Sequence, residues 1–307
     1  MKGFDVLGFS GHSFTIFDTS YCMSEDKLVD YLDELCDARK FFNNEPDAAA
    51  FYFAPECEDA RPIRIYMGIE QDLYSYRPSL RKSNGLFNRG YRYGSFDYII
   101  GSTHAFRLGR EEIEDMSINF DELKLPDMKG IIKTDKSLYI YVDYGPDIMK
   151  WSIENIFGGD PLAFAESYFR DEARIVKETD CDIVGHFDLL LKFNEKDPVF
   201  DESSPRYKAS RDAALDRIFS DFKALDREPV FEVNTGAMAR GYRTVPYPSM
   251  DSLQEIRRRG GRIVINSDCH NKDLLDFAFD EARDLVMKAG YKPELMDVPG
   301  GKLEIFI

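Results

Sequence analysis

The sequence predicts an α/β fold built on a parallel β-sheet, and three observations support this. Short apolar runs alternate with helical patterns along almost the whole chain of 307 residues. Most of the runs are continuous and rich in β-branched residues, as in strands buried on both faces of a parallel sheet. Polar residues that can bind or react follow the runs at their C-terminal ends, and a barrel collects such residues on one rim. We therefore favour a barrel over an open doubly wound sheet.

Six strands are expected, and the first and last of them read FDVLGF and RIVIN. Each is bounded by loop residues or by a helical pattern, as short buried strands are. The six ranges are 4–9, 63–69, 96–102, 182–186, 229–234 and 262–266.

Five helices are expected between and after these strands. The first begins at Ser24, which is a suitable capping residue, and the last two end at Gly260 and Gly290, where a helix C-cap is expected. The five ranges are 24–42, 161–179, 206–225, 249–260 and 271–290, and the segments 43–62 and 72–95 are expected to be loops.

Composition excludes several classes of protein. The net charge of −16 opposes binding to phosphate backbones, so nucleic acid is not an expected partner. No run reaches the roughly 18 apolar residues of a membrane helix, and the N-terminus lacks a signal-peptide pattern, so we expect no membrane partner and a cytoplasmic protein. Five cysteines without a CxxC pair argue against a disulfide framework and a zinc ribbon. No GxGxxG follows the first strand, so a dinucleotide site is not expected.

Histidine is rare here, and each of the four histidines directly follows a predicted strand. They are His12, His104, His186 and His270. Glu70 and Asp268 also stand at strand ends. Imidazole and carboxylate together suit Zn, Mn or Fe, and a carboxylate can bridge two ions. The pattern predicts a hydrolase with more than one divalent metal ion, and a structural metal or no metal is the alternative, because each histidine taken alone could be an ordinary loop or core residue.

The ordered set of motifs resembles the polymerase and histidinol phosphatase (PHP) superfamily, and most closely its histidinol-phosphatase branch. The matching segments are FDVLGFSGHS, YMGIEQDLY, FDYIIGSTH, DCDIVGHFDLL, VFEVNTGA and RIVINSDCH. Each motif is weak by itself, but their order is preserved over nearly the whole chain. The resemblance implies one domain, residues 1–307, with a distorted (β/α)7 TIM-like barrel.

The same resemblance implies a set of metal ligands at the C-terminal rim. They are His12, Glu70, His104, His186, Asp268 and His270, and Glu70, His104, His186 and Asp268 are also the implied catalytic residues. Glu70 would bridge two ions. His104 and His186 would complete the first of these, and Asp268 would belong to the second. His12 and His270 would belong to a third.

The chain departs from the family pattern at its start. The family opens with an H-x-H pair on a strand that precedes the motif matched by His12, and this sequence contains no such pair. We expect the first βα unit, about 35 residues, to be missing, and a version extended by it to be more stable. A start assigned too late, a fragment, and a different residue or subunit filling the gap remain open explanations.

Basic residues after the fifth strand are candidates for binding a substrate. Arg240 and Arg243 lie just beyond Asn234, and a guanidinium can hold phosphate oxygens with its planar fork. The alternative is that both are solvated loop arginines. Asn234 is a candidate contact for the substrate or for a ligand. We therefore expect a small phosphorylated substrate, whereas the oligomeric state is not predicted.

The function implied by the resemblance is hydrolysis of L-histidinol phosphate to L-histidinol and phosphate, a late step of histidine biosynthesis. A different small-molecule phosphoesterase of the same superfamily is one alternative. A catalytically degenerate protein that only binds metal is the other.

Overall fold

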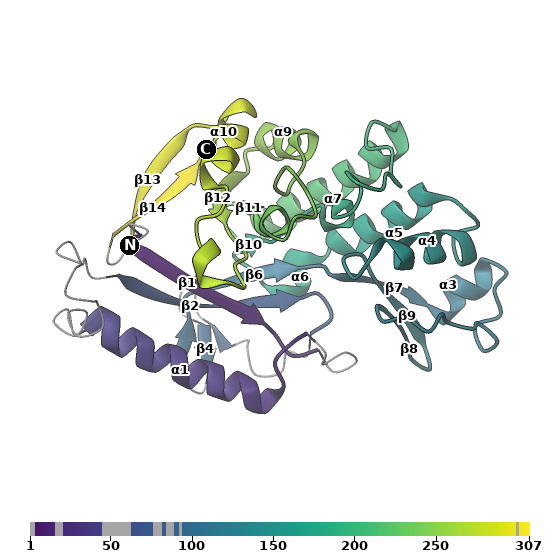
Figure 1. Cartoon of the computed structure of the whole chain (residues 1–307), viewed down its shortest axis with the longest axis horizontal. Coiled ribbons are helices and arrows are strands. Elements are labelled where there is room, and N and C mark those ends of the chain that lie inside the picture. The colour runs from purple at the N-terminus through teal and green to yellow at the C-terminus, as the bar shows by residue number, and fades with distance from the viewer. Residues whose placement is uncertain are drawn as a thin grey trace.

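The structure is a computed structural model that describes residues 4–15, 21–44, 63–75, 82–83, 89–91, 94–298 and 301–307. Its main feature is a curled sheet of eight strands, in the order β1-β2-β6-β10-β11-β12-β14-β13, which forms half of a barrel (Figure 1). These strands are β1 (Val6–His12), β2 (Arg64–Asp72), β6 (Tyr98–Ser102), β10 (Ile183–Val184), β11 (Val230–Asn234), β12 (Arg262–Asn266), β13 (Pro293–Val298) and β14 (Gly301–Phe306).

The first six strands of this sheet are parallel to one another, as the apolar runs predict. Each of the six predicted ranges overlaps one of them, and β1 and β2 extend three residues past their predicted ends, at 9 and 69. β14 then pairs antiparallel to β12, and β13 pairs antiparallel to β14. The arrangement is compatible with a barrel-like fold. Among the described residues, β1 pairs only with β2, so this part of the chain forms an open sheet.

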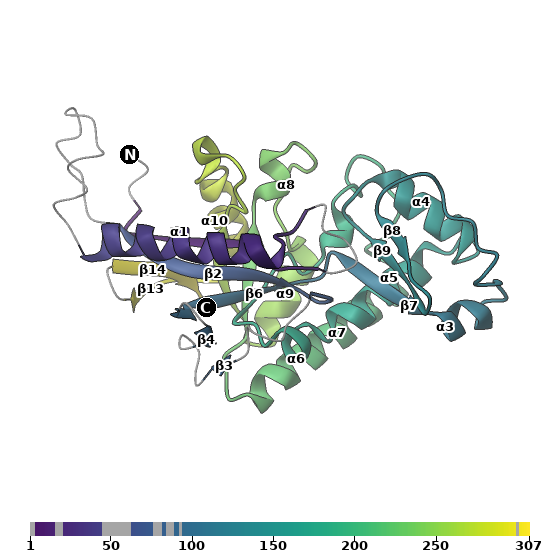
Figure 2. The ribbon, with the colours of Figure 1, turned by 90° about the horizontal axis from the view of Figure 1, so that it is seen from below.

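Helices cover the sheet and connect its strands. They are α1 (Glu25–Asn44), α3 (Arg110–Asp115), α4 (Pro146–Asn155), α5 (Pro161–Glu172), α6 (Ile175–Thr179), α7 (Pro205–Ala224), α8 (Gly236–Ala239), α9 (Met250–Arg258) and α10 (Phe279–Lys288). Helix α1 lies along β1 and β2 (Figure 2) and buries Leu28, Leu32 and Leu35. Because these leucines recur every three or four residues, they form one apolar face. None of the described helices is long and apolar enough to cross a bilayer.

Several predicted boundaries differ from the structure. The range 161–179 holds two helices, α5 and α6, and the range 271–290 contains a short 3₁₀ turn before α10 begins. The described residues of segment 72–95 include the short strands β3 (Lys82–Ser83) and β4 (Arg89–Tyr91) and the start of β5 (Gly94–Phe96). Residues 45–62 of the other predicted loop lie outside the described residues.

The predicted C-caps are confirmed at both glycines. Gly260 has φ +84° and Gly290 has φ +98°. This left-handed conformation is easily adopted by glycine, which has no Cβ, and it ends a helix by turning the chain away.

A second, antiparallel sheet follows His104 directly and was not predicted. It has the order β7-β9-β8, with β7 (Ala105–Gly109), β8 (Ile131–Lys133) and β9 (Ser137–Tyr141). Together with α3, α4 and α5 it forms the lobe opposite α1 (Figure 1). The chain after β9 returns to the end of β6, where the Val142 nitrogen donates to the His104 carbonyl at 2.9 Å. The lobe thereby fixes the backbone at His104.

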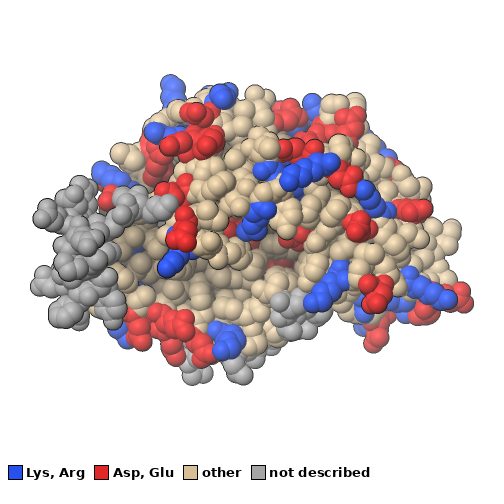
Figure 3. Space-filling view, viewed as in Figure 1, with Lys and Arg blue, Asp and Glu red and all other residues tan. Residues whose placement is uncertain are grey.

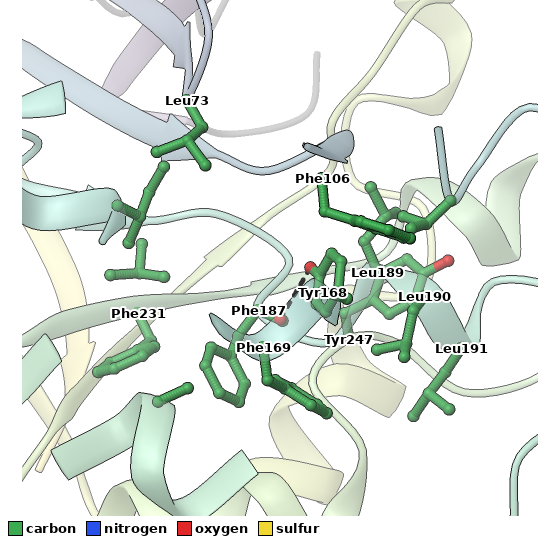
Figure 4. Packing of buried hydrophobic residues seen from close by; sticks show 14 of the residues in the cluster. Leu73, Phe106, Tyr168, Phe169, Phe187, Leu189, Leu190, Leu191, Phe231 and Tyr247 are labelled. Atoms are coloured by element: carbon green, nitrogen blue, oxygen red, sulfur yellow. Dashed lines mark hydrogen bonds between the residues drawn. The ribbon is translucent and has the colours of Figure 1, made fainter. Parts of the chain in front are cut away.

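The core between the sheet and its helices is rich in aromatic residues. Phe106, Phe169, Phe187 and Phe231 are fully buried, and Figure 4 shows them packed with the leucines that follow β10. The Tyr168 hydroxyl donates to the Phe187 carbonyl at 3.0 Å, so the polar atom of this buried ring is satisfied. This packing holds the segment after β10 rigidly, and His186 begins it.

Candidate metal centre

The register of the parallel sheet brings the predicted ligands to one end of neighbouring strands. His12 at the end of β1 is paired with Glu70 on β2, and Asp72 on β2 is paired with Ser102 on β6. Side chains two residues apart on a strand point to the same face, so Glu70 and Asp72 share a side of the sheet. His104 follows β6 and His186 follows β10, the next strand along. The site is therefore assembled from four adjacent strands.

Glu70 is at the centre of this group, and three imidazoles surround its carboxylate. His12 Nδ1 lies 3.3 Å from Oε2, His186 Nε2 lies 3.2 Å from Oε1, and His104 Nε2 lies 3.6 Å from Oε1. The Ser102 hydroxyl donates to Oε1 at 2.5 Å. Adjacent histidine rings have centroids about 5 Å apart, at 5.1 Å for His12 and His104 and 4.9 Å for His104 and His186. The cluster formed by His12, Glu70, His104 and His186 is called the Glu70 cluster below.

The charges of the cluster stabilise one another. Burial alone would raise the pKa of Glu70, but the charge of His12, the hydrogen bond from His186 and the charge of His104 hold it well below its ordinary value. Burial alone would lower the pKa of His104, yet its hydrogen bond to Asp72 and the charge of Glu70 raise that pKa to about 10. The buried carboxylate of Glu70 and the imidazole of His104 thus stabilise each other's charge, and a bound cation would replace the imidazole proton.

Asp72 fixes the orientation of His104, and the sequence reasoning missed it. Its Oδ2 lies 2.9 Å from His104 Nδ1, and its Oδ1 accepts a hydrogen bond from the Tyr74 backbone nitrogen at 3.0 Å. A carboxylate that accepts from Nδ1 leaves Nε2 facing Glu70, which is how ligand histidines are held in metal sites. The signal was present, because Asp72 stands two residues after Glu70 at the same strand end.

Three further residues around the cluster, Tyr21, Asp143 and Lys192, were also missed. The Tyr21 ring packs edge-on against His12, with centroids 5.2 Å apart, and covers that side of the cluster. Lys192 Nζ lies 3.2 Å from Asp143 Oδ2, and the charge of Asp143 contributes to the raised pKa of His104. No strand-end pattern in the sequence points to these residues.

Glu232 links the Glu70 cluster to the neighbouring strands. Its Oε1 accepts from the His186 backbone nitrogen at 2.8 Å and from Asn234 Nδ2 at 2.9 Å, and its Oε2 accepts from Asn266 Nδ2 at 2.9 Å. Burial raises the pKa of Glu232, although these contacts oppose the change. Asn234, a predicted substrate contact, is 1% exposed and holds this carboxylate.

Asp268 and His270 form a separate group with Arg240 at the end of β12. Arg240 Nη2 donates to Asp268 Oδ2 at 2.9 Å, and Arg240 Nη1 lies 3.1 Å from His270 Nδ1 and 3.2 Å from the Asp268 carbonyl oxygen. His270 Nδ1 is also 3.0 Å from that carbonyl. These two predicted ligands are therefore engaged by a guanidinium. The three residues Arg240, Asp268 and His270 are called the Arg240 group below.

Arg243, the other predicted phosphate ligand, is directed into the protein. Its side chain is 7% exposed, with Nη1 donating to the Leu191 carbonyl at 2.9 Å and Nε donating to the Val245 carbonyl at 3.2 Å. The guanidinium carbon lies 4.8 Å from the centroid of the Tyr247 ring. These contacts hold two loops together, so Arg240 is the better placed of the two arginines for a substrate.

The donor atoms of the Glu70 cluster fit a divalent metal ion. Within the described part of the chain, the ligand atoms of His12, Glu70 and His104 lie within 4.8 Å of one another. Nδ1 of His12 and Nδ1 of His186 are buried with no hydrogen-bond partner among the described residues. His12 Nδ1 lies beside Glu70 Oε2, whereas the nitrogen of His186 that faces Glu70 is Nε2. Because buried polar atoms of proteins are almost always paired, the unbonded Nδ1 of His12 beside a carboxylate fits a metal ligand.

The face of the molecule seen in Figure 3 is hollowed near its middle, with acidic and basic side chains interspersed around the hollow. The net charge of −16 is therefore not spread as a uniform negative surface on this face. A small anionic ligand can be held locally where basic side chains or a cation dominate.

No protein-family model matches the chain. Over 152 residues, which are 49% of this chain, it is 23% identical to a protein named "Probable histidinol-phosphatase" from Schizosaccharomyces pombe (strain 972 / ATCC 24843). The match covers 47% of that relative, so the chain spans about half the length of the curated protein that it matches. The chain is thus distantly similar, over about half of its length, to a protein of that name.

Proposed function

We propose that this protein is a metal-dependent phosphatase whose substrate is L-histidinol phosphate. The observation that carries the proposal is the buried Glu70 carboxylate with three imidazoles directed at it from three other strands. The distant similarity to a probable histidinol-phosphatase supports the choice of substrate. Membership of the PHP superfamily and a location in the cytoplasm belong to the same proposal.

In this proposal the Glu70 cluster holds Zn, Mn or Fe. The two carboxylate oxygens of Glu70 face different histidines, so Glu70 is suited to bridge two ions. A divalent metal supplies Lewis acidity toward a phosphoryl oxygen and lowers the pKa of water. Asp72 keeps a proton on Nδ1 of His104, which leaves Nε2 available as a ligand.

The protein's own cations would orient the phosphate. Arg240 is 35% exposed on its side chain and presents a planar guanidinium at the end of β12, so it can donate to phosphate oxygens while it contacts Asp268. Lys192 is a second cation, held by Asp143 near the histidines. Both act by position and charge, which is how phosphoryl transfer is mostly catalysed.

Phosphate release from L-histidinol phosphate in the presence of Mn²⁺ or Zn²⁺ tests the proposal. The wild-type protein is expected to release phosphate, and Glu70→Gln, which keeps the shape and removes the charge, is expected to lose both activity and metal. A panel of other small phosphate esters separates a different phosphoesterase from this one. If the metal-loaded protein hydrolyses none of these compounds, the phosphatase proposal is wrong.

One observation favours a second candidate, a metal-binding protein without catalysis. Asp268 and His270, two of the predicted ligands, are bonded to Arg240. A chain that binds metal stoichiometrically at the Glu70 cluster but releases no phosphate from any ester would fit this alternative.

A further inference from the structure

The Arg240 group differs in kind from the Glu70 cluster, although both were predicted to bind metal. In the Glu70 cluster the imidazoles face a carboxylate. In the Arg240 group a guanidinium lies against the carboxylate, the imidazole nitrogen and a backbone carbonyl at once, at 2.9 to 3.2 Å. A carboxylate oxygen, an imidazole nitrogen and a carbonyl oxygen are the atoms that a divalent cation would otherwise bind.

Two backbone features favour this contact, the glycine at position 236 and the left-handed conformation of Asp268. Gly236 begins α8, and a Cβ added there would stand 2.7 Å from Asp268 Oδ2 and 2.8 Å from Arg240 Nη2. Glycine therefore lets the two charged groups meet. Asp268 itself has φ +45°, a left-handed conformation that is uncommon outside glycine and is found at functional sites. The ion pair is thus held from both sides rather than formed by two mobile surface side chains.

Hydrogen bonds connect the backbone beneath the Arg240 group with the Glu70 cluster. The backbone nitrogen of Gly236 donates to Asn234 Oδ1, Asn234 donates to Glu232, and Glu232 accepts from the His186 backbone. One chain of short hydrogen bonds therefore runs from the residue beneath the Arg240 group to a ligand of the Glu70 cluster.

From these contacts we infer that Arg240 is a resident cation that takes the place of a metal ion at Asp268 and His270. The protein then loads divalent metal at the Glu70 cluster alone. The guanidinium neutralises Asp268 and remains available to a phosphate through its other N–H groups. This inference rests on the proposed metal binding at the Glu70 cluster and concerns how many ions the protein holds.

The experiment counts bound Co²⁺ by equilibrium dialysis and calorimetry, so it does not depend on activity. Glu70→Gln is expected to lose the Co²⁺ that the wild-type protein binds, and Asp268→Asn is expected to keep it. Arg240→Met is expected to bind one further ion, at Asp268 and His270. Its affinity at this position should exceed that of the wild-type protein by on the order of tenfold, which is the effect expected from removing a partly exposed charged pair. The double variant Arg240→Met with Asp268→Asn is expected to lose that gain.

Arg258→Met is the matched control, because Arg258 is an arginine on α9 paired with Glu255 outside both groups. It should leave the Co²⁺ count unchanged. The inference is overturned if Asp268→Asn removes an ion from otherwise wild-type protein, or if Arg240→Met gains none. Failure of Glu70→Gln to remove Co²⁺ is a different result, which would overturn the proposed function instead. Asparagine tolerates the left-handed backbone at position 268, so the Asp268→Asn count is available even if Arg240→Met folds poorly.

Discussion

Replacing Asp72 with asparagine is expected to weaken metal binding at the Glu70 cluster, although Asp72 would touch no metal ion. Asparagine has the size and shape of aspartate but only one acceptor oxygen. In the native protein one carboxylate oxygen accepts from Tyr74 N and the other faces His104 Nδ1. With asparagine, the amide NH₂ must face either the Tyr74 N–H or the His104 ring. If it faces the ring, Nδ1 becomes the acceptor, and the proton moves to Nε2, which is the atom directed at Glu70.

The size of this effect follows from the burial of the pair. His104 is 7% exposed and Asp72 is 3% exposed, so the 2.9 Å contact is a charge-assisted hydrogen bond shielded from water. Such bonds contribute about 1.5–3 kcal/mol, which corresponds to roughly 10- to 100-fold in affinity. Changes to residues that orient metal ligands typically have the same size.

Calorimetric titration with Co²⁺, together with urea denaturation to confirm folding, measures the change. Asp97→Asn is the matched control. Asp97 is also a buried aspartate, between β5 and β6, but its oxygens accept from Met67 N and Arg39, away from the histidines. Asp97→Asn should lower stability and leave the Co²⁺ affinity of the folded protein unchanged. A folded Asp72→Asn protein whose affinity stays within about threefold of wild type (under 1 kcal/mol) would refute the reasoning.

Three further predictions concern the surroundings of the site. Burial raises the pKa of Glu172 well above 4.5, so the folded protein keeps a proton that the unfolded chain releases above about pH 4.5. The stability of the wild-type protein therefore falls as the pH rises. The stability advantage of Glu172→Gln over wild type should grow by up to about 1.4 kcal/mol per pH unit. Urea denaturation at pH 5 and pH 8 measures this, and an equal difference at both values contradicts it. Gly236→Ala should separate Arg240 from Asp268 at a cost below about 1 kcal/mol and add a Co²⁺ site as Arg240→Met does, so an unchanged ion count would contradict the role of this glycine. Leu190→Ala, in the core of Figure 4, should lower the free energy of unfolding by about 2–5 kcal/mol without changing Co²⁺ affinity once folded, and a loss below 1 kcal/mol would mean that the residue is less well packed than the structure has it.

The parallel part of the fold could be predicted because its strands are buried on both faces. Continuous runs such as RIVIN mark such strands even when they are short. β10 consists of Ile183 and Val184 alone, yet its run was recognised because both residues are apolar and β-branched. The β7-β9-β8 sheet was missed because its strands interrupt the strand–helix alternation on which the prediction depended. No local sequence pattern indicates that this segment returns to His104.

The members of the site that stand at strand ends could be predicted from the sequence, whereas the contacts of its long side chains could not. A residue type at the C-terminal end of a strand indicates which rim it joins, and this brought His12, His104 and His186 to Glu70. It does not indicate what a long side chain does after leaving the backbone. Arg240 and Arg243 lie three residues apart, yet one reaches the rim and the other is buried under carbonyl oxygens. Only tertiary contacts separate the two.

The Glu70 cluster draws its members from β1, β2 and the ends of β6 and β10, which are separated along the chain by helix α1, the antiparallel lobe and α4 to α6. An ion held there would cross-link four distant parts of the polypeptide, much as a disulfide does, but reversibly. Unfolding would then require the ion to leave, so a chelator should act on this protein as a denaturant, and partly folded fragments should have little affinity for the ion.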